Sequence, residues 1–317
     1  MKKNRVLLVG FIIMVTMSLV LVGCGGSDSN SQTPSNSNQE PAPTPAPGNE
    51  DNQAASIGEQ VNYEIIGIDP GAGLMAATRD VIEQYGLSDW KLVESSDSAM
   101  TAALKRAYSN QQPIIVTGWT PHWKFSSFDL KYLDDPLNIY GGDEQIHTLV
   151  RVGLQNDHPS AYQVLDNFLW EPGDMADVMV LIEEGMNEVD AAADWVNNNA
   201  DKVSAWTDGV DKVDGDKLNL AYVAWASEIA STNVIANVLE QVGYNVTLQQ
   251  LEAGGMFAGL ASGSSDAIVA AWLPTTHEAF YERFQADFED LGPNLDGTRI
   301  GLVVPAYMDI DSIEDLK

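Results

Sequence analysis

Val81-Ile-Glu-Gln-Tyr-Gly-Leu87 is repeated with few changes as Val238-Leu-Glu-Gln-Val-Gly-Tyr244, and the similarity continues on both sides of the two copies. An apolar run typical of a strand precedes each copy. A second short strand, a helix that begins with methionine and a strand ending in Trp-x-Pro follow each copy. The chain therefore contains two similar βαβαβ units. Two such units indicate two lobes, and the cleft between lobes is where ligands bind.

The repeat also predicts which residues share a site. Trp119 and Trp272 are equivalent, because each lies in a Trp-x-Pro strand end. Trp225 closes a predicted strand at 220–225, which matches the strand that leads into the Asp69–Gly73 turn. Ligands gather at the carboxyl ends of parallel strands. We therefore expect three indole rings and one glycine turn to line the same cleft.

A long segment between the two repeat units is predicted to be helical. Residues 159–207 have helical periodicity, and three tryptophans in or near this stretch fit a buried core stripe: Trp170, Trp195 and Trp206. Further along, the sequence predicts a helix at 281–288, a strand at 300–304 and a short helix at 312–316 that returns to the first lobe. Alternating strands and helices favour an α/β fold in which each lobe is a mostly parallel sheet flanked by helices.

Three converging indoles suit a particular kind of cation. A quaternary ammonium has no N–H to donate to a carboxylate, whereas an indole face attracts it through the ring quadrupole. A single tryptophan is more often part of a core, but three at equivalent strand ends favour a cage. The two glycines of the Asp69–Gly73 turn permit positive φ and close backbone approach.

The turn also opens a helix, and the free N–H groups of Gly73 and Leu74 would favour a carboxylate there. The alternative is a tight βα turn with no ligand. His277 could donate a further hydrogen bond to the same carboxylate, or could be an ordinary exposed residue near a helix start. A cation cage and an anion site in one cleft describe a receptor for a small zwitterion.

The N-terminal segment predicts export. A basic head, Lys2–Arg5, precedes the apolar run 6–22, which leads to the lipobox cysteine Cys24. A retained membrane helix is the alternative, since about 17 apolar residues are near the lower limit for spanning. The segment 24–59 is rich in Ser, Asn, Gln, Pro and Gly, a composition that is typical of disorder. We therefore predict a lipoprotein with a flexible tether, anchored on the outer face of the cell membrane.

Composition argues against several other functions. The net charge of −30 repels nucleic acids and anionic lipid headgroups. One cysteine excludes internal disulfides and cysteine zinc sites, and the four histidines lack metal-ligand spacing. Phosphate-loop, nucleophile-elbow and zinc-protease motifs do not occur in the sequence. We therefore predict a binding protein that is not an enzyme and has no metal or cofactor.

Five long motifs resemble the glycine betaine-binding lipoproteins of osmoprotectant ABC importers, and most closely their OpuAC type. These motifs are Ile65-Ile-Gly-Ile-Asp-Pro-Gly-Ala-Gly73, Thr117-Gly-Trp-Thr-Pro-His-Trp123, Leu130-Lys-Tyr-Leu-Asp-Asp-Pro136, Ala221-Tyr-Val-Ala-Trp225 and Gly301-Leu-Val-Val-Pro305. The resemblance extends over 61–317. It implies a type II periplasmic-binding-protein fold, in circularly permuted order, whose lobes close on the ligand.

The same resemblance implies roles for individual residues. The residues that it assigns to the trimethylammonium cage are Trp119, Trp225 and Trp272. Those that it assigns to the carboxylate are Gly73 and Leu74, through backbone amides, and His277. Leu74 replaces an isoleucine that is common in the family, which leaves a backbone contact unchanged. The implied partners are a small zwitterion and an ABC permease, and we expect the protein to be a monomer.

These inferences divide the chain into four parts. They are a signal peptide (1–23), a tether (24–59), a lobe with the glycine turn and Trp119 (60–147 with 305–317), and a lobe with Trp225, Trp272 and His277 (148–304).

Other ligands and functions stay open. Choline, carnitine, proline betaine or another methylated zwitterion would also suit the cage. An ordinary amino acid would require an acidic residue in the cleft. A tethered enzyme has no motif in its favour. An adhesive module would explain the lipobox but not the paired Trp-x-Pro ends.

Overall fold

The computed structural model describes residues 55–317, so the predicted signal peptide, Cys24 and all but the end of the predicted tether lie outside the described residues. Regular structure begins with helix α1 (Ile57–Gln60), which lies partly inside the predicted tether. Ser56 and Glu59 form a capping box that satisfies N–H groups of this short helix. The end of the predicted tether therefore overlaps a helix.

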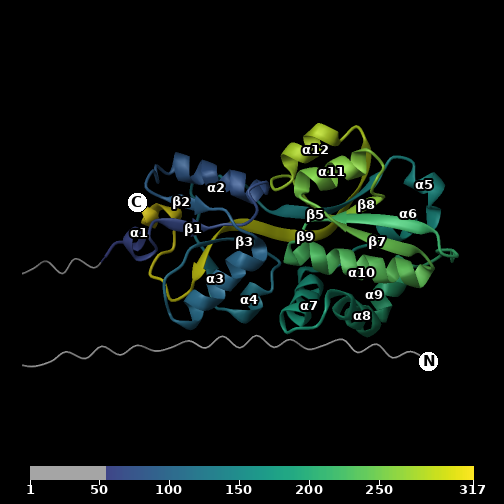
Figure 1. Ribbon diagram of the computed structural model, residues 1–317, viewed down its shortest axis with the longest axis horizontal. Helices are drawn as coiled ribbons and strands as arrows, with labels where there is room; N and C mark the ends of the chain where they lie inside the picture. Colours follow the sequence, from purple (N-terminus) through teal and green to yellow (C-terminus); the bar gives the residue numbers. More distant parts are fainter. Residues whose placement is uncertain (1–54) are drawn as a thin grey trace, which may run out of the picture. The chain divides into compact units, whose positions relative to one another are not determined.

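The described residues form two lobes, each built around a sheet with helices on both faces (Figure 1). The first lobe contains β1 (Glu64–Ile66), β2 (Lys91–Val93), β3 (Val116–Thr120), β4 (Leu130–Tyr132), α1, α2 (Gly73–Gln84), α3 (Asp97–Ser109) and α4 (Lys124–Ser127). The second contains β5 (Glu144–Arg151), β6 (Lys217–Tyr222), β7 (Asn245–Gln250), β8 (Ala267–Leu273), α5 (Leu154–Asp157), α6 (Pro159–Asn167), α7 (Pro172–Glu183), α8 (Glu188–Asn198), α9 (Ala200–Trp206), α10 (Ala226–Val242), α11 (Ala253–Ala261) and α12 (Glu278–Phe284).

Each predicted βαβαβ unit is parallel, but the sheets around the units are mixed. In the first lobe β1 pairs in parallel with β2 and β3, and in the second β6 pairs in parallel with β7 and β8. The strands β4, β5 and β9 (Phe288–Pro305) pair antiparallel with their neighbours. The strand order is β2-β1-β3-β9-β5-β8-β6-β7, with β4 also on β9. The α/β class is confirmed.

β9 is the element that sequence reasoning described least well. Its first part pairs with β5 and its last part with β3, so one strand runs through both sheets (Figure 1). The predicted helix 281–288 is wrong at its end, because α12 stops at Phe284, and the predicted strand 300–304 is much too short. Asp, Gly and Pro in 289–297 disfavour a strand locally, and irregular pairing with β5 overrides that preference. The chain passes from one sheet to the other within β9, and β5 begins at Glu144. The predicted lobe limits at residues 147 and 304 stay a prediction.

The core confirms the buried tryptophans of the second lobe. Trp170, Trp195 and Trp206 are 3, 3 and 2% exposed, and the rings of Trp195 and Trp206 stack with centroids 5.9 Å apart. The C-terminal 3-10 helix (Ile313–Leu316) packs on the first lobe, where Leu316 accepts a hydrogen bond from the indole of Trp90. Within residues 55–317, every helix falls short of the length and apolar character needed to cross a bilayer.

Candidate ligand-binding site

One cavity brings the three predicted cage tryptophans together. Trp119 comes from the first lobe and Trp225 and Trp272 from the second, and they are 4, 4 and 2% exposed. The ring centroids of Trp119 and Trp225 lie 6.3 Å apart and the rings are tilted by 51°. The other residues that line the cavity are Ile68, Leu74, Thr276 and Ile300. The indoles therefore converge on a single space between the lobes.

The two Trp-x-Pro segments have the same local structure. β3 ends at Thr120 and β8 at Leu273, and in both cases a cis proline bond follows. Proline has no N–H to continue a ladder, so each strand stops there. Trp119 and Trp272 consequently occupy the penultimate position of their strands, at the edge that borders the cleft.

Trp225 lies outside the strand in which the sequence places it. β6 ends at Tyr222, and Trp225 is the N-cap residue of α10. Its indole N–H donates a hydrogen bond of 2.9 Å to Asp69 Oδ2 of the first lobe. The ring also lies parallel to the imidazole of His277, with centroids 5.7 Å apart. A residue of the opposite lobe thus fixes the orientation of this indole.

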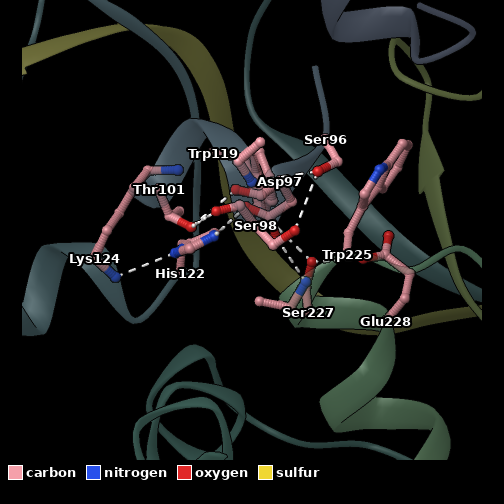
Figure 2. Close-up of polar contacts among 12 residues, drawn as sticks. Ser96, Asp97, Ser98, Thr101, Trp119, His122, Lys124, Trp225, Ser227 and Glu228 are labelled. Atoms are coloured by element: carbon pink, nitrogen blue, oxygen red, sulfur yellow. Dashed lines mark hydrogen bonds and ion pairs between the residues drawn. The ribbon is translucent and has the colours of Figure 1, made fainter. Parts of the chain in front are cut away.

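Trp119 is held in the same way from the other side. Its Nε1–H donates to the hydroxyl of Ser227, the second residue of α10, at 3.1 Å (Figure 2). Two indole hydrogen bonds therefore cross between the lobes in opposite directions. Sequence reasoning missed Ser227 and the acceptor role of Asp69, because each residue's partner lies on the other lobe.

The start of α2 is open toward the cavity. Its N-cap residue, Ala72, gives no side-chain cap, and among the described residues neither the Gly73 nor the Leu74 N–H has a hydrogen-bond partner. A Cβ built on Gly73 would overlap the carbonyl oxygen of Thr276 in the second lobe. Neither Gly71 nor Gly73 has a positive φ, so that part of the prediction is wrong. Gly73 is required instead because the second lobe packs directly against its backbone.

His277 is fully buried, which excludes the exposed alternative. Its Nδ1 accepts the backbone N–H of Trp272 at 2.9 Å, so the proton of the neutral ring lies on Nε2. Burial lowers the pKa of His277 to about 3, and the ring is neutral near pH 7. Nε2 has no partner in the described part of the chain. The residue does not itself line the cavity; it lies beside Trp225 and immediately after Thr276.

Glu144 is a buried residue that sequence reasoning missed. Its carboxyl oxygens accept the N–H groups of Thr275 and Thr276 at 2.8 and 2.6 Å, and the Thr276 hydroxyl at 2.8 Å. Burial raises its pKa, and these hydrogen bonds act in the opposite direction. Glu144 therefore fixes the turn that presents Thr276 to the cavity.

A third contact between the lobes lies beside Trp119. The carboxylate of Asp97, 4% exposed, pairs with His122 Nε2 at 3.1 Å and accepts the N–H of Ala226, the first residue of α10, at 2.9 Å (Figure 2). Burial acts to raise the pKa of Asp97, but His122 and Lys124 together with the hydrogen bond from Ala226 lower it below its usual value. A charged carboxylate at the start of a long helix is favourable. Residues 55–317 contain no group of three or more His, Cys, Asp or Glu that could hold a metal ion.

The fold and the cavity define a two-lobed α/β binding protein. Comparisons with known proteins identify its family. Residues 48–198 and 216–317 match OpuAC, the substrate binding domain of ABC-type glycine betaine transport system. The glycine betaine/carnitine transport binding protein GbuC of Listeria monocytogenes serotype 1/2a (strain 10403S) is 57% identical over 264 residues, which are 82% of this chain and 88% of that protein.

Two solved structures are also similar over part of their length. Lactococcal OpuAC, in its closed-liganded conformation complexed with glycine betaine, is 46% identical, with a TM-score of 0.45 and coverage of 47% of this chain and 59% of that chain. The glycine betaine/L-proline-binding protein ProX of Borrelia burgdorferi is 40% identical, with a TM-score of 0.44 and coverage of 47% and 57%. The chain thus spans less than two thirds of either structure.

The chain belongs to the OpuAC family of substrate-binding domains. This membership confirms the predicted resemblance, and it confirms a substrate-binding protein of an ABC transporter rather than an enzyme. Such proteins work outside the cytoplasm, where they bind a small ligand and deliver it to a permease.

Proposed function

We propose that the cavity binds glycine betaine, with its trimethylammonium group among Trp119, Trp225 and Trp272. The convergence of these three indoles on one cavity carries the proposal. Each face contributes roughly 0.5–2 kcal/mol when it is desolvated. Three faces and the burial of the methyl groups would together approach about −8 kcal/mol, which corresponds to micromolar affinity.

The carboxylate would lie at the start of α2. The N–H groups of Gly73 and Leu74 supply two donors at the positive end of a helix, and Leu74 lines the cavity. His277 is the third proposed donor, since its neutral ring carries the proton on the unpaired Nε2. Its imidazole lies outside the cavity lining, so we expect it to reach the carboxylate past the edge of Trp225.

The cavity disfavours an ordinary amino acid, because no acidic side chain lines it and a primary ammonium would have no counter-charge there. Carnitine is the second candidate, because the listerial relative is named for both glycine betaine and carnitine. Choline has no carboxylate and would leave the donors of Gly73 and Leu74 unused. We therefore expect choline to bind at least tenfold more weakly than glycine betaine.

Titration calorimetry tests the cage. Glycine betaine should bind the wild-type protein, and Trp119→Ala, Trp225→Ala and Trp272→Ala should each weaken binding at least tenfold while thermal unfolding stays cooperative. Tyr307→Ala serves as a control, because Tyr307 is 39% exposed and lies outside the cavity. Unchanged binding by two of the three tryptophan variants would remove the cage.

We also propose that the protein is a monomer anchored through acylated Cys24, with the segment after it as a tether to the folded lobes. The support is the lipobox pattern, together with a family whose members act outside the cytoplasm. Cys24→Ser should release the protein from the membrane fraction into the medium. Retention of this variant in the membrane would point to an uncleaved helix instead.

A further inference from the structure

Lys124 occupies an unusual position for a lysine. It is the first residue of α4 and is 0% exposed, and no other lysine of residues 55–317 is buried. Its Nζ lies 4.1 Å from the centroid of the Trp119 ring and has no hydrogen-bond partner in the described part of the chain. The centroid of the Phe125 ring lies farther away, at 5.7 Å, so the aromatic ring nearest to this ammonium is an indole of the proposed cage.

The ligand cavity borders the same indole. Trp119 and Trp225 both line the cavity, whereas Lys124 does not. Figure 2 shows Lys124 and Trp225 on opposite sides of Trp119. A ligand ammonium in the cage would consequently share the π-system of Trp119 with the lysine amine.

The groups around Lys124 leave its charge poorly compensated. Asp97 is the acid whose charge acts on Lys124, but its carboxylate is already bonded to His122 and to the N–H of Ala226. Within residues 55–317, Lys124 makes no salt bridge. Burial lowers the pKa of His122 to about 4, and that of Lys124 to about 7 despite the opposing effect of Asp97. His122 is thus neutral near pH 7, where Lys124 changes charge. Glu228, buried on α10, has a pKa raised by burial to about 8, so its titration also falls in this pH range.

We propose that Lys124 sets the affinity of the cage through its charge: protonated, it competes with the ligand ammonium for the electrons of Trp119, and neutral, it permits tight binding. This inference rests on the proposed binding of a quaternary ammonium. A ligand cation about 5 Å beyond the ring would lie about 9 Å from Nζ. At an effective dielectric constant of about 20, the repulsion at that distance corresponds to roughly a twentyfold loss of affinity. Because the lysine is charged below its pKa, affinity should rise with pH.

The test compares variants that lose the same charge at different places. Calorimetry with glycine betaine at pH 6, 7 and 8.5 (set points chosen to span about one unit either side of the titration) would be run on wild type, Lys124→Met and Lys91→Met. Lys91 is exposed on β2 of the same lobe. Wild type and Lys91→Met should bind about tenfold more weakly at the lowest pH than at the highest. Lys124→Met should lose this dependence and bind at the lowest pH as tightly as wild type does at the highest.

A second readout needs no variant. Binding of glycine betaine to the wild type at pH 7 should release a fraction of a proton from Lys124, because the ligand cation favours the neutral amine and glycine betaine itself has no group that titrates near this pH. The release is measured as a dependence of the binding heat on the ionisation enthalpy of the buffer. The proposal is overturned if wild type releases no proton. It is also overturned if Lys124→Met keeps the wild-type pH dependence or if Glu228→Gln alone abolishes it. Absence of binding by wild type at every pH would instead refute the proposed function.

Discussion

Asp69 should contribute to binding through one hydrogen bond between the lobes. Its carboxylate accepts the indole N–H of Trp225 at 2.9 Å, and this bond connects the first lobe to a cage ring of the second. A hydrogen bond to a charged group contributes about 1.5–3 kcal/mol. Asp69 is only half-buried, so the lower end applies, which corresponds to about a tenfold loss of affinity in Asp69→Ala.

The loss of this hydrogen bond should affect ligand binding and not the folding of the ligand-free protein. We expect the lobes to separate without ligand, in which case the bond exists only in the closed form. Asp69→Ala should therefore weaken glycine betaine binding about tenfold in calorimetry but leave the melting temperature of the ligand-free protein near that of wild type. Asp69→Asn keeps an acceptor oxygen and should bind better than Asp69→Ala. Wild-type affinity in Asp69→Ala, or an equal loss of ligand-free stability, would refute this role.

Three further changes test other parts of the site. Gly73→Ala places a methyl group on the carbonyl of Thr276, so closure of the lobes should be strained and affinity for glycine betaine should fall at least tenfold. Full affinity would show that the lobes do not close in this arrangement. Glu144→Ala leaves the N–H groups of Thr275 and Thr276 unpaired and should lower the free energy of unfolding by about 1–3 kcal/mol, measured by denaturant titration; an unchanged midpoint would contradict the support of this turn. Burial raises the pKa of Glu228 to about 8, so the folded state holds a proton that the unfolded state releases near 4.5, and stability should fall as pH rises between these values; Glu228→Gln should flatten this dependence, and an unaltered pH profile of the melting temperature would contradict it.

The internal repeat made the parallel parts of the fold predictable from sequence. It indicated both βαβαβ units and the equivalence of Trp119 and Trp272, and the structure places both residues penultimate in their strands. The length of β9 was not predictable, because Asp, Gly and Pro within 289–297 disfavour a strand and only pairing with β5 makes one. Local propensity could not reveal a strand that depends on its neighbours.

In the candidate site, too, local patterns could be found from sequence, whereas tertiary contacts could not. Trp119 and Trp272 lie at matching strand ends and Trp225 follows the end of β6, so the three tryptophans of the cavity could be found from sequence. Ser227, Glu144 and the acceptor role of Asp69 depend on contacts between segments far apart in the chain, and no local pattern indicates such contacts. The need for glycine at position 73 was anticipated, but its main cause, the approach of Thr276 from the other lobe, is a tertiary contact.

A crystal structure of the protein with glycine betaine would test the central claim most directly. The ligand nitrogen should lie within about 6 Å of the ring centroids of Trp119, Trp225 and Trp272. The carboxylate should lie at hydrogen-bond distance from the N–H groups of Gly73 and Leu74. A ligand bound outside this cavity, or one whose carboxylate rather than its ammonium lies among the indoles, would contradict it.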